Sequence, residues 1–352
     1  MKKVVVKIGT NVLARPDGLL DVTAISQLTD QFAALKQQGI ELIVVSSGAV
    51  GAGRAAVRLP SDVDKVVQRQ VLAAVGQPRL MQVYTTLLER YQLYCAQVLA
   101  TKEDFRDRQH YLNMKNCFLA LLRDNIIPIV NENDVTSVSE LMFTDNDELA
   151  GLVASMTGAD TLVILSSVDG ILSAPPGHPD SRLIPVVDVD DRKTATFITT
   201  EKSSFGRGGM HTKYRFARQA ARVGIDTWIA NGKRPNILVD LAAGKGVGTR
   251  FVAGDAPNNL KKWMAYAGGS HKATVFVNDG AAAALSNRVS SLLPVGITAI
   301  EGDFERGDLV QISFGTVVLG VGIAQYGSES ARQWLGQKGK RPLVHYDYMY
   351  LS

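Results

Sequence analysis

The chain has 352 residues, of which 46% are hydrophobic and 20% charged, and its formal net charge is +4. At roughly 150 residues per domain, this length predicts two domains with cores of their own, which excludes a disulfide-stapled miniprotein and a largely disordered chain. A charge of +4 over this length is far weaker than the clustered positive charge typical of nucleic-acid-binding proteins.

The two cysteines, Cys95 and Cys117, lie apart from any second CxxC or histidine cluster, so the sequence predicts neither a zinc site nor a disulfide framework. Both are interpreted as free thiols in a reducing compartment. The first residues read MKKVVVKIG. The apolar run in this segment is too short for a signal peptide and is interrupted by Lys7. No apolar run reaches the length of about 18 residues that a membrane span needs. We therefore expect a cytoplasmic protein without membrane contact.

Short runs rich in Val and Ile alternate with longer helical patterns over the first two-thirds of the chain. The strand-like runs cover residues 4–8, 42–45, 126–130, 162–165 and 227–230. The helical patterns cover residues 22–38, 66–91, 112–124, 147–156 and 212–223. This alternation predicts an α/β fold with an open, mostly parallel sheet sandwiched by helices.

The pattern changes after about residue 250, where turn residues separate short strand-like runs. These runs cover residues 274–277, 309–312, 317–323 and 343–346, with almost no helix beyond residues 281–285. We therefore expect a first domain over 1–255, a linker over 256–272 and a small β-rich domain over 273–352.

Polar and glycine residues follow the predicted strands, at the edge where α/β proteins bind ligands. The relevant segments are KIGT (7–10), SSGAVGAG (46–53), NEND (131–134), DND (145–147) and GGMHTK (208–213). Glycine loops that lead into helices expose backbone N–H groups to phosphate oxygens, and lysines supply positive charge to a phosphoryl group in transfer. The segments therefore point to phosphoryl chemistry.

Other readings of these segments remain open. The chain has no GxxxxGK[ST] motif, and residues 48–53 have the wrong spacing for GxGxxG, which disfavours P-loop and ordinary Rossmann proteins. Taken singly, SSG, NEND and DND are ordinary helix caps or turns, and Lys213 is an ordinary solvated residue. Lys7 is different, because a lysine within a buried strand has to reach water, a partner or a ligand.

In order and spacing, these motifs resemble those of the glutamate 5-kinase family, in the amino acid kinase superfamily. The similar segments are VKIGT (6–10), VSSGAV (45–50), VNEND (130–134), DND (145–147), GRGGMHTK (206–213) and ARVGIDT (221–227). Beyond the linker, SSLLPVGI (290–297), FERGD (304–308) and VHYD (344–347) are similar to a PUA domain. The resemblance covers essentially the whole chain.

This resemblance implies that ATP phosphorylates the γ-carboxylate of L-glutamate, the first step of proline biosynthesis. It implies that Lys7 and Lys213 flank the transferring phosphoryl group and that Asp147 holds both lysines through ion pairs. It assigns glutamate binding to Ser47, Gly48, Ala49, Asp134 and Asn146. It assigns nucleotide binding to a larger set, namely Lys7, Gly9, Ser166, Ser167, Arg207, Gly208, Gly209, Met210, His211, Thr212 and Lys213.

A carboxylate is already a nucleophile at neutral pH, so the reaction needs no general base. The task is to bring two anions together, which the lysines, helix N-termini and Mg²⁺ make possible. No protein metal cage is visible, so we expect Mg²⁺ to be held by nucleotide phosphates and water.

The chain departs from the family in one loop. The family has Thr-Asp or Ser-Asp and then Gly-Leu-Tyr, whereas residues 166–172 read SSVDGIL. The carboxylate expected at Ser167 and the aromatic ring expected at Leu172 are missing. We therefore expect weaker discrimination between ATP and other purine nucleotides.

Two alternatives remain. One is another carboxylate kinase of the superfamily, acting on aspartate or N-acetylglutamate. The other is an RNA-binding regulatory protein acting through the PUA-like domain, although nine basic and seven acidic residues from residue 256 onward do not favour RNA as a partner. The resemblance also leads us to expect proline as a feedback inhibitor, a homo-oligomer (dimer or tetramer) and a glutamyl phosphate reductase as partner.

Overall fold

A computed structural model of the chain describes residues 1–60, 62–136, 143, 145–174, 178–189, 209–254, 271–287 and 290–351. The chain divides into two compact units, of which the first comprises residues 1–103 and 113–256 and the second comprises residues 104–112 and 257–352. The units are described separately. Since the predicted linker lies almost entirely outside the described residues, its boundaries stay a prediction.

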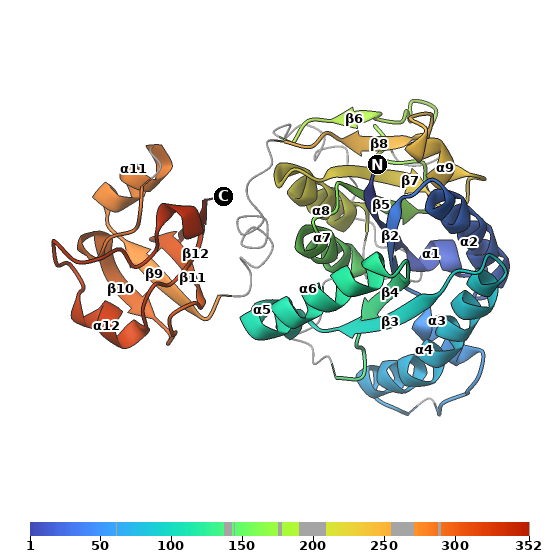
Figure 1. Cartoon of the computed structure of the whole chain (residues 1–352), viewed down its shortest axis with the longest axis horizontal. Helices are drawn as coiled ribbons and strands as arrows, with labels where there is room; N and C mark the ends of the chain where they lie inside the picture. The colour runs from blue at the N-terminus through green and yellow to red at the C-terminus, as the bar shows by residue number, and fades with distance from the viewer. Residues whose placement is uncertain are drawn as a thin grey trace. The chain divides into compact units, whose positions relative to one another are not determined.

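The first unit is built on an eight-stranded sheet with the order β3-β4-β2-β1-β5-β7-β8-β6 (Figure 1). Its strands are β1 (Lys3–Ile8), β2 (Glu41–Ser46), β3 (Cys95–Ala100), β4 (Ile127–Glu132), β5 (Thr161–Ser166), β6 (Val186–Val187), β7 (Asp226–Asn231) and β8 (Gly248–Phe251). Neighbouring strands are parallel except β7 and β8. Strands β4 and β5 are buried along their whole length, as apolar runs in a parallel sheet predict.

Helices cover both faces of this sheet (Figure 1). The helices of the first unit are α1 (Thr10–Leu13), α2 (Val22–Gln37), α3 (Ala49–Arg54), α4 (Lys65–Glu89), most of α6 (Arg108–Arg123), α7 (Asn146–Thr157), α8 (Met210–Arg222) and α9 (Ile237–Ala242), and the short α5 (Lys102–Arg106) lies mostly in residues of the second unit. Side chains of α2, α4 and α9 share one core with alternate residues of β1 and β2, such as Val4 and Val44. The predicted α/β class, an open and mostly parallel sheet sandwiched by helices, is confirmed.

Every strand predicted for this unit is present, but several elements were not predicted. Strand β3 escaped prediction because it is only partly buried and carries Gln97 among small residues. Helices α3 and α9 have six residues each, which is too short for a helical period to be recognised. Among the described residues, no helix is both long and apolar enough to cross a membrane.

The second unit contains a five-stranded sheet with the order β10-β9-β11-β12-β13. Its elements are β9 (Ala273–Val277), α11 (Asp279–Asn287), β10 (Ile297–Glu301), β11 (Leu309–Phe314), β12 (Val317–Ile323), α12 (Ser328–Gln333) and β13 (Met349–Leu351). The β-rich prediction is confirmed, with two corrections. Residues 343–346 form no strand, because Val344 makes only an isolated bridge with Leu292, and α12 is a helix where almost none was expected.

Candidate active site

The carboxyl ends of the parallel strands bring the predicted site residues to one edge of the first sheet. Lys7 lies near the end of β1, Ser47 follows β2, Asp134 follows β4 and Ser166 ends β5. Two backbone hydrogen bonds link the strand ends, from Ser47 N to Ile8 O at 3.3 Å and from Gly9 N to Leu165 O at 3.2 Å. Segments far apart in the sequence therefore form one site.

Asp147, at the start of α7, lies between the two lysines. Its Oδ1 is 2.6 Å from Lys7 Nζ, and its Oδ2 accepts a hydrogen bond from Lys213 Nζ at 2.9 Å. Asp147 is completely buried, while Lys7 and Lys213 are 4% and 9% exposed. Since one carboxylate faces two ammonium groups, this triad carries one positive charge in excess.

The triad shifts the pKa values of its members. Burial acts to raise the pKa of Asp147, but the two ammonium groups outweigh burial and hold that pKa well below its usual range. Burial also lowers the pKa of Lys7, and the nearby Asp147 offsets this effect only in part. For Lys213, burial acts in the same direction, but Asp147 and Asp145 exceed it and raise the pKa.

Asp145 and Thr212 tie the starts of α7 and α8 together. Asp145 caps α7, because its Oδ1 accepts a hydrogen bond from Asp147 N at 2.8 Å. Its Oδ2 accepts a hydrogen bond from Thr212 Oγ1, also at 2.8 Å. Thr212 precedes Lys213 in α8, so this bond fixes the distance between the helix starts that carry Asp147 and Lys213.

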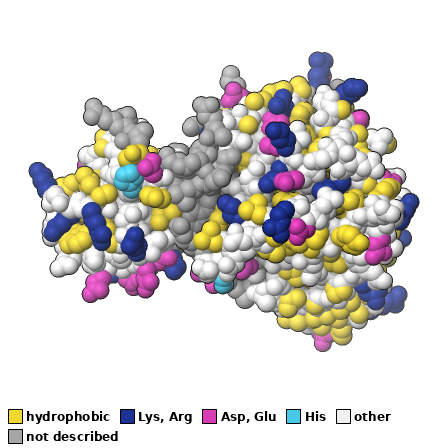
Figure 2. Space-filling view, viewed as in Figure 1, with side chains coloured by type: hydrophobic (Ala, Val, Ile, Leu, Met, Phe, Trp, Pro, Cys, Tyr) yellow, Lys and Arg dark blue, Asp and Glu magenta, His cyan; other side chains and the backbone are white. Residues whose placement is uncertain are grey.

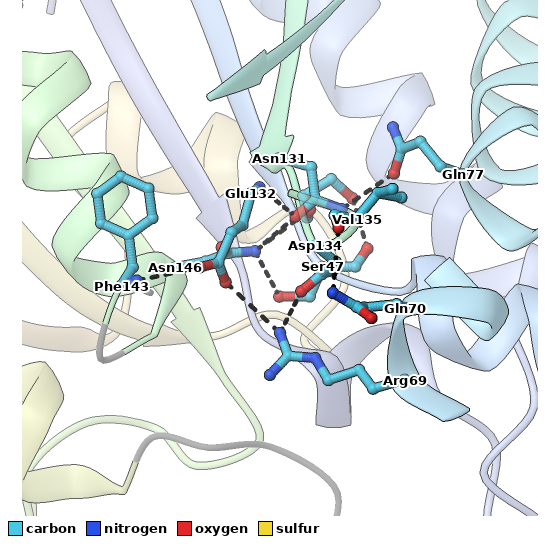
Figure 3. A network of polar contacts seen from close by, with 11 residues as sticks. Ser47, Arg69, Gln70, Gln77, Asn131, Glu132, Asp134, Val135, Phe143 and Asn146 are labelled. Carbon is cyan, nitrogen blue, oxygen red and sulfur yellow. Dashed lines mark hydrogen bonds and ion pairs between the residues drawn. The ribbon is translucent and has the colours of Figure 1, made fainter. Parts of the chain in front are cut away.

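Asn146, which precedes Asp147 of the triad in the sequence, belongs to a second polar cluster (Figure 3). Its side-chain amide donates to Ser47 Oγ at 3.1 Å and to Asn131 Oδ1 at 3.0 Å. Asn131 Nδ2 in turn donates to Gln77 Oε1 at 3.0 Å. The amide therefore connects α7 to the loop after β2, and through β4 to α4.

The loop after β2 is shaped by Gly48. This residue has φ 112, a left-handed conformation in which glycine is strongly favoured, and it forms the N-cap of α3. Helix α3 then begins at Ala49, so the backbone N–H groups of its first turn lie at the loop. Ser47, Gly48 and Ala49 thus provide a hydroxyl group and helix-terminal N–H groups beside Asn146.

The sequence-based prediction missed Arg69 and Gln77 on α4 and Asn131 and Glu132 on β4. Arg69 donates to Asp134 and, at 3.5 Å, to Glu132 Oε2. Asn131 and Glu132 belong to the NEND motif that the sequence analysis identified, but only Asp134 of that motif was assigned to the site. Nothing in the helical pattern of α4 distinguishes Arg69 from its exposed neighbours.

Comparison with known proteins identifies the family. Residues 2–231 match the model of the amino acid kinase family, and residues 273–346 match that of the PUA domain. The chain is 48% identical over 354 residues to a protein of Chlorobaculum tepidum named glutamate 5-kinase, covering 99% of this chain and 97% of that protein. It is 49% identical over 355 residues to a glutamate 5-kinase of Bacteroides thetaiotaomicron, covering 99% and 98%. The chain belongs to the glutamate 5-kinases, within the amino acid kinase family.

Solved structures agree on the fold of the first unit. Carbamate kinase from Giardia lamblia bound to AMP-PNP matches 72% of this chain and 99% of its own, with a TM-score of 0.52 and 18% identity. The product complex of isopentenyl phosphate kinase from T. acidophilum matches 71% of this chain and all of its own, with the same TM-score and 17% identity. At these identities the likeness concerns the fold alone.

The structure describes most of the residues predicted to bind the nucleotide, but not all of them. Gly209 is the N-cap of α8, whose first turn holds Met210, His211, Thr212 and Lys213, whereas Arg207 and Gly208 lie outside the described residues. Ser166 is buried at the end of β5 and Ser167 is exposed. Asp169, the only acidic residue between 166 and 172, is engaged by Arg234 at 2.6 Å and 2.7 Å and by Asn231 at 3.0 Å. Both carboxylate oxygens of Asp169 therefore already accept hydrogen bonds from these two residues.

The residues present fit the phosphates of a nucleotide. A Cβ atom built on Gly9 would lie 3.1 Å from Leu165 O, so glycine at this position lets the end of β1 approach the end of β5 closely beside Lys7. The two lysines of the triad lie at the same edge of the sheet, where they supply positive charge. Within the part of the chain that the structure describes, no group of three or more His, Cys, Asp or Glu side chains could hold a metal ion.

Proposed function

We propose that this protein transfers the γ-phosphoryl group of ATP to the γ-carboxylate of L-glutamate, giving L-glutamyl 5-phosphate in the first step of proline biosynthesis. The observation that carries the proposal is the start of α7. There, two consecutive residues serve two neighbouring sites: Asn146 joins the Ser47 cluster, and Asp147 joins the two lysines. We call the cluster with Ser47 and Asn146 the acceptor cluster. A glutamate held there lies next to a phosphoryl group held by the two lysines.

The acceptor cluster has the chemistry that an amino acid with two carboxylates requires. Ser47 and the backbone N–H groups of Gly48 and Ala49 suit a carboxylate, and the anionic Asp134 suits the α-ammonium group. The amide of Asn146 fixes the Ser47 hydroxyl beside this loop. The bound γ-carboxylate is ionised at neutral pH, so no residue has to remove a proton from it.

Transfer forms a bond from a glutamate carboxylate oxygen to the γ-phosphorus and breaks the bond from that phosphorus to the oxygen bridging to ADP. The electron pair of the broken bond stays on ADP. Lys7 and Lys213 stabilise the charge on the equatorial and bridging oxygens, while Asp147 keeps both ammonium groups in place. Mg²⁺ on the phosphates adds positive charge.

Family membership supports three further proposals about partners. Proline acts as a feedback inhibitor, the protein assembles as a dimer or tetramer, and a glutamyl phosphate reductase in the cytoplasm consumes the labile product. Proline titration of the activity, light scattering and a coupled reductase assay test them in turn.

Hydroxylamine trapping of the acyl phosphate tests the acceptor. We expect a hydroxamate with Mg-ATP and glutamate, and none above background with aspartate or N-acetylglutamate. Activity with aspartate alone, or with N-acetylglutamate alone, would contradict the proposed function and favour another carboxylate kinase.

A further inference from the structure

Arg69 connects α4 to the end of β4, on the acceptor side of the site. Its Nη2 donates to Asp134 Oδ1 and to Glu132 Oε2 (Figure 3). The side chain of Arg69 is 28% exposed, while those of Glu132 and Asp134 are 4% and 9% exposed. One guanidinium group therefore serves two nearly buried carboxylates from another element.

The charge of Arg69 affects the state of Asp134. Burial raises the pKa of Asp134, and the neighbouring Arg69 opposes this effect through its charge and its hydrogen bond. Without Arg69, two buried carboxylates would remain at the end of β4 beside each other. A protonated Asp134 would lose most of its attraction for an ammonium group.

Side chains of α4 and β4 also bond to the backbone near Asp134. Gln70, next to Arg69, donates through Nε2 to Val135 O at 3.1 Å. Glu132 Oε1 accepts a hydrogen bond from Phe143 N at 3.0 Å, and Phe143 is 1% exposed. Gln70 thus holds the chain just after β4, while Glu132 holds Phe143 through a bond that does not involve Arg69.

We propose that Arg69 is a positioning residue for the acceptor, which orients the Asp134 carboxylate toward the α-ammonium group of glutamate. The proposal rests on the proposed function. Arg69 acts through Asp134, so its loss weakens glutamate binding without affecting the lysine triad. Loss of Arg69 therefore raises the KM for glutamate and leaves the KM for ATP and kcat nearly unchanged.

Steady-state kinetics of Arg69→Met, Arg69→Lys and the control Arg79→Met test this role. Arg79 is exposed on the same helix, and no ion pair or hydrogen bond joins its side chain to the described residues. We expect Arg69→Met to raise the KM for glutamate about tenfold or more, with kcat and the KM for ATP within about twofold of wild type. Arg69→Lys should restore part of the loss, because it keeps the positive charge but not the planar guanidinium group. An unchanged KM for glutamate, or an equal loss in kcat and both KM values, would overturn the proposal.

A double-mutant cycle with Asp134→Asn separates positioning from a direct contact. If Arg69 acts through the carboxylate, Arg69→Met costs little more once Asp134→Asn has removed it. Equal costs of Arg69→Met in both backgrounds would overturn the role. Failure of the proposed function would look different, because the wild-type protein would then form no hydroxamate from glutamate at all.

Discussion

Lys7 is a lysine on a strand at the middle of the sheet, and its burial has a consequence for pH dependence. Burial lowers its pKa, and the attraction of Asp147 offsets this effect only in part. The protonated form that the phosphoryl group needs is therefore lost at a lower pH than for an ordinary lysine, whose pKa is about 10.4.

We therefore predict an alkaline decline in kcat/KM for ATP that begins below the ordinary lysine range. This quantity reports groups of the enzyme before ATP binds, when no phosphate opposes the loss of the proton. A pH series with saturating glutamate measures it. A flat profile up to the pH at which ordinary lysines lose their protons would contradict the assigned charge state of Lys7.

Ser167 stands where the family pattern has an aspartate. Its side chain is exposed after β5, and the nearby Asp169 is engaged by Arg234 and Asn231. We predict that Ser167→Asp raises the ratio of kcat/KM for ATP to that for GTP, because a carboxylate at this position adds a polar contact to the nucleoside. Equal or sharper discrimination by the wild-type protein would refute this.

At the scale of elements, α4 packs against α3 so closely that only glycine fits at two positions. A Cβ atom on Gly76 would lie 1.8 Å from Ala49 O, and one on Gly53 would lie 2.0 Å from Leu72 O. Because α3 begins at Ala49, directly after Ser47 and Gly48, this contact supports the acceptor loop.

We predict that Gly76→Ala lowers the free energy of unfolding by about 1–3 kcal/mol and raises the KM for glutamate. The methyl group has to push α4 away from the start of α3. Urea unfolding and kinetics measure the two effects. Gly254→Ala in the same unit is the control, since its nearest contact would be an ordinary 3.6 Å. Equal stability of the two variants would count against the coupling of α4 and α3.

The residues of α4 at the site are ones that the sequence did not predict. Apolar runs such as residues 4–8 predicted most of the strands of the first unit, and the polar residues after them predicted which segments would meet at the edge of the sheet. Arg69 and Gln77 could not be predicted, because a polar residue on a long helix reads as solvated. Only the packing of α4 on α3 and β3 brings them to the end of β4, where they bond with residues more than 50 positions away, such as Gln77 with Asn131.

At the scale of the whole molecule, several basic side chains among the described residues of the second unit contact other side chains of that unit. Lys340 Nζ lies 5.4 Å from the centre of the Trp334 ring, and the Arg341 guanidinium lies 4.9 Å from the Tyr326 ring. On the face in Figure 2, the basic side chains of this unit are interspersed with hydrophobic ones. This arrangement differs from a continuous cationic surface for a nucleic acid backbone.

We therefore predict that filter binding with structured RNA at physiological salt shows no tight association. With nine basic and seven acidic residues from residue 256 onward, any weak binding should also vary little with salt. Tight binding that weakens steeply as salt is raised would revive the RNA-binding alternative.

The most direct test of the account as a whole is ADP release with glutamate and Mg-ATP by the wild-type protein, Lys7→Ala and Lys213→Ala. Each lysine lies within 3 Å of the same carboxylate, at 2.6 Å and 2.9 Å from Asp147. We predict a loss in kcat of about 10²-fold or more in each variant, with circular dichroism showing that the fold is retained. Unchanged rates in both folded variants would contradict the assignment of the two lysines to phosphoryl transfer.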